Sequence, residues 1–468
     1  MRSIIKMLGI IRKELKIFFL TIGLFVPSDF CSAQEWQILT VDEGVKPSIA
    51  VDADGLPHVA YMLEAIPGYL RHAILPAGSE DFVITEIDNA YYYGPLDIEI
   101  GSDGRPAVAL HNHDDEDQNV YWLNESGIWV KHRVRDDGHD GWDNSVVFSA
   151  DGLLHTSSVD PSQFGETSSI EYAWYDGNGW RVEKIGSGPI LYQFSTSIAL
   201  QSNGNPAISY FDDISNQPKY ALRSGGNWQI MTVPSSGGMF SSLVFDQSNN
   251  PHITFYTVVN GNSGLVRYAY LNDDLWVVED IDELSNVPIT FTGARNVTSL
   301  AIDPQGSLHV VFNDRDELKY AIRAENNWNV ETILDKTNST ETFGAQASLA
   351  LDHESNPHIT YFEVTNLNPL RGVIKYVTRK SATTSSHQES DKLEIFPVPA
   401  AKDGYLTMPG ATENSQIQLV DMNGKSLLLS VNDSVISLAG LELAPGTYFI
   451  VLGSHGSESR ILRRIILH

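Results

Sequence analysis

One phrase recurs seven times along this chain and limits what the chain can fold into. It consists of an apolar strand, a tight turn and a second strand that begins near Pro-His, as in SIAVDADGLPHVAY and SLALDHESNPHITY. The copies are 45 to 57 residues apart and begin at Ser48, Ile98, Val146, Ser197, Ser242, Ser299 and Ser348. A period of this length is typical of architectures in which each repeat forms one supersecondary unit.

The turn in the phrase and the residues after it predict four strands per repeat. Dipeptides such as Asp54-Gly55 and Asn203-Gly204 supply the positive φ angles that a two-residue hairpin turn needs. A third strand is expected around His72, Tyr121, Tyr172, Tyr220, Tyr268, Tyr320 and Tyr376. A fourth strand is expected near Phe82, Trp129, Trp180, Trp228, Trp276 and Trp328. Four short strands per repeat indicate the blade of a β-propeller.

The seventh repeat ends after its third strand, and the N-terminal segment matches the strand that is missing. Residues 35–41 read EWQILTV and resemble NWQIMTV at 227–233, a fourth strand elsewhere in the chain. We therefore expect this segment to form the outer strand of the last blade and to close the ring. The predicted fold is all-β, a seven-bladed β-propeller over residues 34–380 that is closed by the N-terminal strand.

The first 33 residues have the pattern of a secretory signal peptide. Five basic side chains accompany an apolar run, from Ile17 to Val26, that is too short to span a bilayer. Cleavage after Ala33 would remove Cys31, the only cysteine, and leave a mature protein without disulfides. A lipoprotein that keeps Cys31 as its acylated residue is the alternative. Either way, the protein is expected to be secreted or to lie at the outer cell surface.

The charge balance bears on the class of partner. The chain has 31 Lys and Arg against 59 Asp and Glu, a formal net charge of -28. Nucleic-acid binding is disfavoured because no basic patch would neutralise the phosphates. We expect an extracellular polysaccharide as the partner and a monomeric protein.

The C-terminal region differs in composition from the repeats. Residues 381–392 form a polar linker, and 393–468 predict a small β-sandwich of short strands with Gly and Pro turns. The sandwich region contains FPVP at 396–399, DMNGK at 421–425, LAPGTY at 443–448 and a basic end. It resembles the C-terminal sorting domain of the type IX secretion system of Bacteroidetes. The resemblance implies export by the type IX secretion machinery. A carbohydrate-binding sandwich is the alternative.

The repeats themselves also resemble a known group. In blade length and phrase, residues 35–380 are similar to secreted bacterial propellers with sialidase-like, BNR-type repeats. This resemblance implies a fold and no activity. The Ser-x-Asp-x-Gly-x-x-Trp phrase of true sialidases is absent from the sequence, which argues against sialidase chemistry.

Residues that break the repeat indicate where a functional site would lie. In a propeller, the loops between strands two and three and those after strand four share one face, which we call the mouth face, where ligands usually bind. By contrast, one repeat position holds histidines that we predict to be structural and bonded to a neighbouring blade: His58, His155, His252, His309 and His358. The irregular segments are HNHDDED at 111–117 and DDGHDGWD at 136–143.

These segments and other mouth-face loops supply the candidate residues. The candidates for acid–base catalysis and for neutralising a uronate carboxylate are His113, His139, Tyr192 and Arg295. The candidates for ligand binding are His111, Trp142, Tyr92 and Tyr93. If the protein has a cofactor, we expect Ca²⁺ at Asp114 and Asp117, since hard cations favour carboxylate loops.

Two functions remain open at this point, and so does the alternative that these loops form no functional site. The protein is interpreted as a polysaccharide-binding propeller, because no catalytic motif is visible. The alternative is a polysaccharide lyase in which His and Tyr act as base and acid and Arg295 neutralises a uronate. Charged loops on an acidic exported protein can also be merely solvated.

Overall fold

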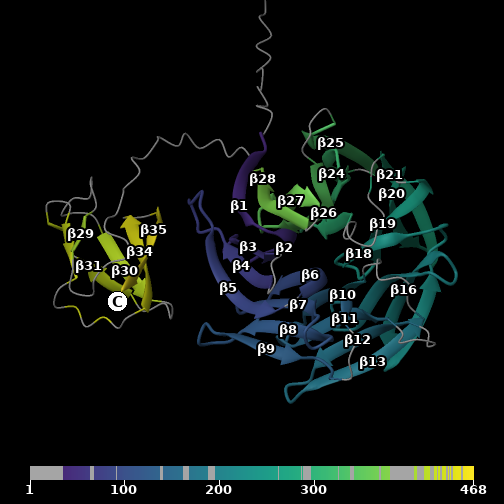
Figure 1. Cartoon of the computed structure of the whole chain (residues 1–468), viewed down its shortest axis with the longest axis horizontal. Helices are drawn as coiled ribbons and strands as arrows, with labels where there is room; N and C mark the ends of the chain where they lie inside the picture. Colours follow the sequence, from purple (N-terminus) through teal and green to yellow (C-terminus); the bar gives the residue numbers. More distant parts are fainter. Residues whose placement is uncertain are drawn as a thin grey trace, which may run out of the picture.

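A computed structural model describes residues 35–379, with gaps at 64–67, 91, 137–140, 162–167, 188–195, 262, 286, 288–296, 325, 338–341 and 368–369. It also describes short strands between 405 and 467. Seven four-stranded antiparallel sheets form a ring, which confirms the predicted seven-bladed β-propeller (Figure 1). No helix in the described ranges is long and apolar enough to cross a membrane.

Each blade is a sheet of four strands, named in order from the propeller axis outward. Blade one contains β2 (Val45–Val51), β3 (Pro57–Leu63), β4 (Gly68–Ile74) and β5 (Val83–Ala90). Blade two contains β6 (Tyr92–Ile100), β7 (Pro106–Asn112), β8 (Asp117–Leu123) and β9 (Trp129–Arg133). Blade three contains β10 (Trp142–Phe148), β11 (Leu154–Asp160), β12 (Ser169–Tyr175) and β13 (Trp180–Ser187). Blade four contains β14 (Ser197–Leu200), β15 (Pro206–Asp212), β16 (Gln217–Ser224) and β17 (Asn227–Thr232).

The remaining three blades follow the same order. Blade five contains β18 (Met239–Phe245), β19 (Pro251–Asn260), β20 (Ser263–Asn272) and β21 (Leu275–Leu284). Blade six contains β22 (Thr298–Ile302), β23 (Leu308–Asn313), β24 (Glu317–Ala324) and β25 (Asn327–Asp335). Blade seven contains β26 (Thr342–Leu351), β27 (Pro357–Leu367), β28 (Leu370–Thr378) and β1 (Gln37–Glu43).

The N-terminal strand closes the ring as the sequence predicts. Strand β1 pairs antiparallel with β28, with Gln37 opposite Thr378 and Glu43 opposite Val373 (Figure 1). Just before β1, the Trp36 ring packs edge-on against Tyr320 of blade six, with centroids 5.2 Å apart. The Arg379 guanidinium lies 4.6 Å from the Trp36 ring centroid and hydrogen-bonds to Glu331. The two ends of the propeller sequence therefore meet in one blade.

The repeat histidines are structural, but their partners differ from the prediction. His155 is hydrogen-bonded to the Tyr172 hydroxyl at 2.7 Å, and His358 is bonded to Tyr376 at the same distance. Each pair lies within one blade, so the predicted bond to a neighbouring blade is wrong. The tyrosine ring instead provides the contact between blades, because it packs edge-on against the next blade's aromatic residue, as Tyr172 does on Trp228.

Blade two departs from the predicted register by one residue. In blade four, Tyr220 lies opposite Ser209, the fourth residue of the second strand. In blade two, Val120 and not Tyr121 lies opposite the corresponding residue, Ala109. The assignment of Tyr121 to the common aromatic position is therefore wrong. The Tyr121 hydroxyl donates a hydrogen bond to Asp88 of blade one, at 2.5 Å.

The described C-terminal residues form two small antiparallel sheets. One contains β31 (Ser426–Leu429), β30 (Gln416–Asp421), β34 (Gly446–Ser454) and β35 (Ser457–Leu467). The other contains β29 (Tyr405–Thr407), β33 (Val435–Ser437) and β32 (Val431–Asn432). Two sheets of short strands agree with the predicted all-β segment. The proposed signal peptide and linker lie outside the described residues.

Candidate functional site

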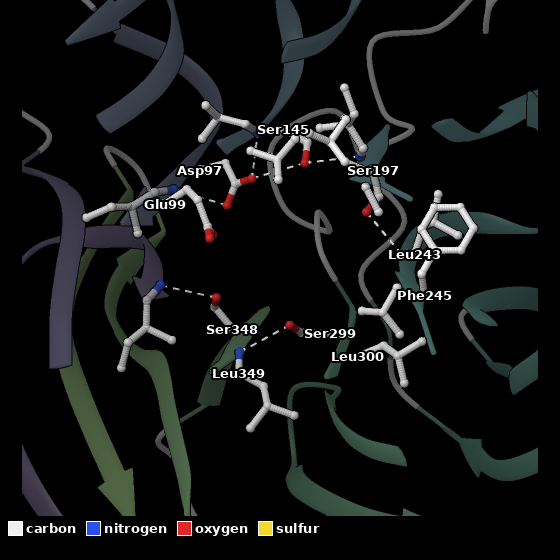
Figure 2. Close-up of a pocket in the computed structure, with 18 residues that line it drawn as sticks. Asp97, Glu99, Ser145, Ser197, Leu243, Phe245, Ser299, Leu300, Ser348 and Leu349 are labelled. Atoms are coloured by element: carbon white, nitrogen blue, oxygen red, sulfur yellow. Dashed lines mark hydrogen bonds between the residues drawn. The ribbon is translucent and has the colours of Figure 1, made fainter. Parts of the chain in front are cut away.

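The inner strands of all seven blades surround a cavity on the propeller axis (Figure 2). Its volume is about 350 Å³. Around the axis, one repeat position at the start of the phrase is occupied in turn by Ser48, Asp97, Ser145, Ser197, Ser242, Ser299 and Ser348. Blade two alone has a carboxylate in this ring of serines.

The serines connect adjacent blades. The Ile49 N–H of blade one donates to Ser348 Oγ of blade seven at 3.2 Å, and the Ile198 N–H of blade four donates to Ser145 Oγ at 3.3 Å. The same bond links blades four to five, five to six and six to seven. Because this bond repeats around the axis, the ring of serines is part of the scaffold.

Asp97 replaces this pattern with a four-donor site that joins three blades. Its Oδ1 accepts from the Ser48 hydroxyl of blade one at 3.0 Å and from the Ile98 N–H at 3.1 Å. Its Oδ2 accepts from the Ser145 hydroxyl and the Val146 N–H of blade three, each at 3.0 Å. Burial raises the pKa of the Asp97 carboxyl, and these hydrogen bonds act in the opposite direction.

Glu99 is a second departure on the same strand. It lies two residues after Asp97, and residues two apart on a strand point to the same side. The other six blades have only small apolar residues at this position: Ala50, Val147, Ala199, Val244, Ala301 and Ala350. Figure 2 shows the Glu99 side chain pointing into the cavity. Burial, followed by the charge of Asp97, raises the pKa of Glu99 to about 8.

At the mouth face, blade two has an unusual polar pair in its core. His111, which is 1% exposed, lies directly opposite the buried Gln118. In each of the other six blades at least one member of this cross-strand pair is apolar, as in Met62 with Leu70 and Phe211 with Pro218. A polar pair in a core position is tolerated when its groups are bonded, and the bonds of Gln118 reach into blade three.

The His111 imidazole connects blade two with blade three. Its ring stacks on the half-buried Trp142 indole, with centroids 4.5 Å apart and planes inclined by 26°. The exposed His113 is also nearby, with its ring centroid 6.2 Å from that of His111. The structure thus brings three predicted site residues together. One face of the indole is covered by the imidazole, and Trp142 also packs against the blade-three core.

Gln118 is the centre of a buried amide network. Its Nε2 donates to Asn144 Oδ1 at 2.5 Å, and its Oε1 accepts from the Thr156 hydroxyl at 3.5 Å. Gly141 allows this close approach, because it has a φ of 76° and a Cβ there would lie 2.4 Å from the Gln118 Cα. A larger residue at 141 would separate blade three from this network.

The outer part of this region consists of paired charges. Arg133 contacts Asp117 at 2.9 Å and Asp115 at 3.3 Å. Arg135 pairs with the buried Glu171, a position that carries Arg or Lys in five other blades. Because Arg133 and Arg135 each have a carboxylate partner, this part of the rim is charge-balanced and not basic.

Of the remaining predicted catalytic and ligand-binding residues, three are outside the described part of the chain and two lie on the strand next to His111. His139, Tyr192 and Arg295 lie outside the described residues. Tyr92 and Tyr93 lie on β6, and their backbones pair with Asn112 and His111 of β7. Their roles remain predictions.

The predicted calcium ligands lie where β7 turns into β8. The Asp114 N–H donates to Asn112 Oδ1 at 3.0 Å, and the Asp117 carboxylate contacts Arg133. Among the described residues, no three or more His, Cys, Asp or Glu side chains are grouped to hold a metal ion. Calcium at this loop stays a prediction.

The fold and this site define the chain as a seven-bladed β-propeller with a polar junction between two blades. No protein-family model matches the chain, and neither does any curated protein. A solved PL25 ulvan lyase bound to -[GlcA(1-4)Rha3S]- matches 73% of this chain and 97% of its own, with 12% identity and a TM-score of 0.50. A Penicillium chrysogenum alpha-L-arabinanase complexed with arabinobiose covers the same shares, with 12% identity and a TM-score of 0.42. The intramolecular trans-sialidase from Ruminococcus gnavus matches with 12% identity, 72% and 94% coverage and a TM-score of 0.38. These structural neighbours are carbohydrate-active propellers, and at such identities the likeness shows the fold alone.

Sequence reasoning missed four residues of these sites: Asp97, Glu99, Gln118 and Glu171. Two had a visible signal, because DIEI at 97–100 replaces phrases such as SIAV and SIAL. Glu171 also had one, since it directly precedes the repeat tyrosine where other blades have a cation. Gln118 was hidden by the one-residue shift of β8, which appears only in the strand pairing.

Proposed function

We propose that this protein binds an extracellular polysaccharide at the mouth face, over the junction of blades two and three. The observation that carries this proposal is the cross-strand pair of His111 and Gln118 at a position that is at least partly apolar in every other blade. A scaffold of equal stability would need only apolar residues there. The pair is buried, so its role would be to hold in place the exposed His113 and the Trp142 indole, whose polar and aromatic groups are suited to a sugar.

The surroundings of the pair support a sugar ligand of low charge. The Trp142 indole stacks on His111 and lends an aromatic edge to the junction. The rim cations Arg133 and Arg135 are already engaged by carboxylates. A strongly anionic chain would have to displace those carboxylates on a protein whose net charge is -28.

A lyase is the second candidate, and one observation favours it. The fold is shared with a PL25 ulvan lyase, with a TM-score of 0.50. The exposed His113 beside His111 would then act as a base or an acid in the abstraction of a proton next to a uronate. Tyr192 and Arg295 are proposed for the partner roles, from the sequence alone.

A panel of plant and algal polysaccharides separates the two functions. Binding would be measured by calorimetry, and lyase activity by the rise in ultraviolet absorbance of an unsaturated uronate. We expect binding without turnover. Turnover that His113→Ala abolishes would establish the lyase, whereas no binding and no turnover on any polysaccharide would contradict both functions.

Matched variants then test the position of the site. His111→Phe introduces the residue that blade four has at this position, so we expect the propeller to fold and the affinity to fall about tenfold or more. His252→Phe removes a structural imidazole of blade five, and should lower stability while the affinity per folded molecule stays unchanged. Unchanged affinity in His111→Phe would show that the site lies elsewhere.

A further inference from the structure

We propose that Glu99 is a proton-controlled latch in the central cavity: its protonated form keeps blade two packed into the ring, and its ionised form loosens that blade. This inference goes beyond the proposed function and does not depend on a ligand. It starts from the fact that, among the described residues that line the cavity, carboxyls occur only on β6 of blade two (Figure 2).

The first step concerns the surroundings of Glu99. Among the described residues that line the cavity, Asp97 is the only other titratable or charged group; the rest are serines and apolar residues from all seven inner strands. The Glu99 carboxyl has no hydrogen-bond or ion-pair partner in the described part of the chain. An ionised Glu99 would therefore face a like charge with no described cation to compensate it.

The second step concerns what Asp97 holds. Its two oxygens bind Ser48 of blade one and Ser145 of blade three. Charge repulsion from Glu99 would act on the carboxylate that fastens blade two to both neighbours. Water that enters to solvate an ionised Glu99 would compete for the same hydrogen bonds.

The third step links the cavity to the mouth face. Strand β6 pairs with β7 in two stretches separated by a register shift: Glu99 lies opposite Ala107 in one, and Tyr93 lies opposite His111 in the other. Loosening of β6 would therefore reach the strand that carries His111. The latch thus makes the structural order of the strands at the candidate glycan site depend on pH.

The expected pH range follows from linkage. In the closed ring, burial and then the charge of Asp97 raise the pKa of the half-buried Glu99 to about 8, whereas its ordinary pKa of about 4.5 applies once the strand is loosened and hydrated. The equilibrium constant for the opening of blade two should then increase about tenfold per pH unit between pH 6 and 8. Blade six has Ala301 at the equivalent position and lacks this dependence.

Hydrogen–deuterium exchange of the mature full-length chain tests the latch. Peptides from β6–β8 and from β22–β24 would be compared at pH 6, 7 and 8, with exchange times scaled to the intrinsic chemical rate. We expect the protection factors of blade two to fall about tenfold per pH unit relative to those of blade six. Glu99→Ala introduces the residue that four other blades have at this position, and it should remove this fall.

Two further variants make the result decisive. Glu99→Gln keeps the shape of the side chain and should behave like Glu99→Ala, and it replaces that variant if the alanine protein does not fold. Glu86→Gln, at an exposed residue of β5, should keep the wild-type pH dependence. Equal loss of protection in blades two and six, or a fall that persists in both Glu99 variants, would overturn the proposal.

Discussion

At the scale of single residues, the repeat histidines show how a buried polar group can serve a scaffold. Burial lowers the pKa of His155 to about 4, and burial together with nearby His58 lowers that of His72 to about 3. Both rings are therefore neutral in the folded protein at pH 7. Their hydrogen bonds, such as the 2.9 Å contact between His58 and His72, satisfy groups that would otherwise be costly inside a blade.

This arrangement predicts that acid destabilises the propeller. The folded imidazoles bind no proton until the pH reaches about 4, whereas unfolded histidine is protonated below about pH 6.5. Stability should therefore be lost progressively as the pH falls from about 6.5 towards 4. Denaturant unfolding of the mature chain at pH 7, 6, 5 and 4 would measure the loss.

A variant of one residue provides the control for the acid prediction. His72→Tyr introduces the partner that the other repeat histidines have, since Tyr172, Tyr268, Tyr320 and Tyr376 occupy that place. It should fold and show a shallower decrease of stability with falling pH, because one depressed imidazole is gone. The same slope in both proteins would contradict the assignment of the effect to buried histidine.

At the scale of strands, the sequence predicted the number of strands well and their register less well. Strand β8 is assigned correctly in position, but its register is shifted by one residue, so that Val120 lies where a tyrosine was expected. A shift of one residue turns every side chain of a strand to the other face. This is why Gln118 is in the core and Tyr121 bonds to Asp88. No local sequence pattern predicted either contact.

The closing strand allows a prediction for stability. Deleting residues 35–43 removes β1, the packing of Trp36 on Tyr320 and the stacking of Arg379. The free energy of unfolding of the whole ring should fall by about 3–5 kcal/mol, because the pairing of a whole strand is lost together with the half-buried Trp36. Denaturant unfolding of the mature chain, followed by circular dichroism and by fluorescence, would measure it.

A matched tryptophan distinguishes ring closure from the loss of one contact. Trp276 packs edge-on against Tyr220 with centroids 5.5 Å apart, much as Trp36 does on Tyr320. Trp276→Ala should cost about as much as Trp36→Ala, whereas deletion of the whole strand should cost more than either and destabilise all blades together. A deletion that cost no more than the single substitution would argue against closure as a source of stability.

At the scale of the whole molecule, the propeller and the C-terminal segment are expected to have separate tasks. The type IX sorting resemblance covers residues 393–468, after a polar linker. Removing these residues should leave a folded propeller that accumulates in the periplasm of a host with a type IX system. Cell fractionation with immunoblotting would locate it, and arrival of the truncated protein in the medium at normal levels would contradict the proposed export route.

The sequence by itself determined the architecture, because a repeated phrase imposes the same local pattern of strands and turns seven times. The missing fourth strand of the last repeat even indicated how the ring closes. Those inferences rest on periodicity and turn residues, which are local properties.

The composition of the candidate sites was decided only by the tertiary structure. His111, Gln118 and Trp142 come from different strands, and Asp97 and Glu99 face a cavity shared with the six other blades only when the ring is closed. Cross-strand register, the approach of one blade to the next and the burial of a carboxyl arise from contacts between residues far apart in the chain. A local pattern cannot contain such contacts, and this is why the sequence pointed to the blades of the proposed site but not to the pairing within it.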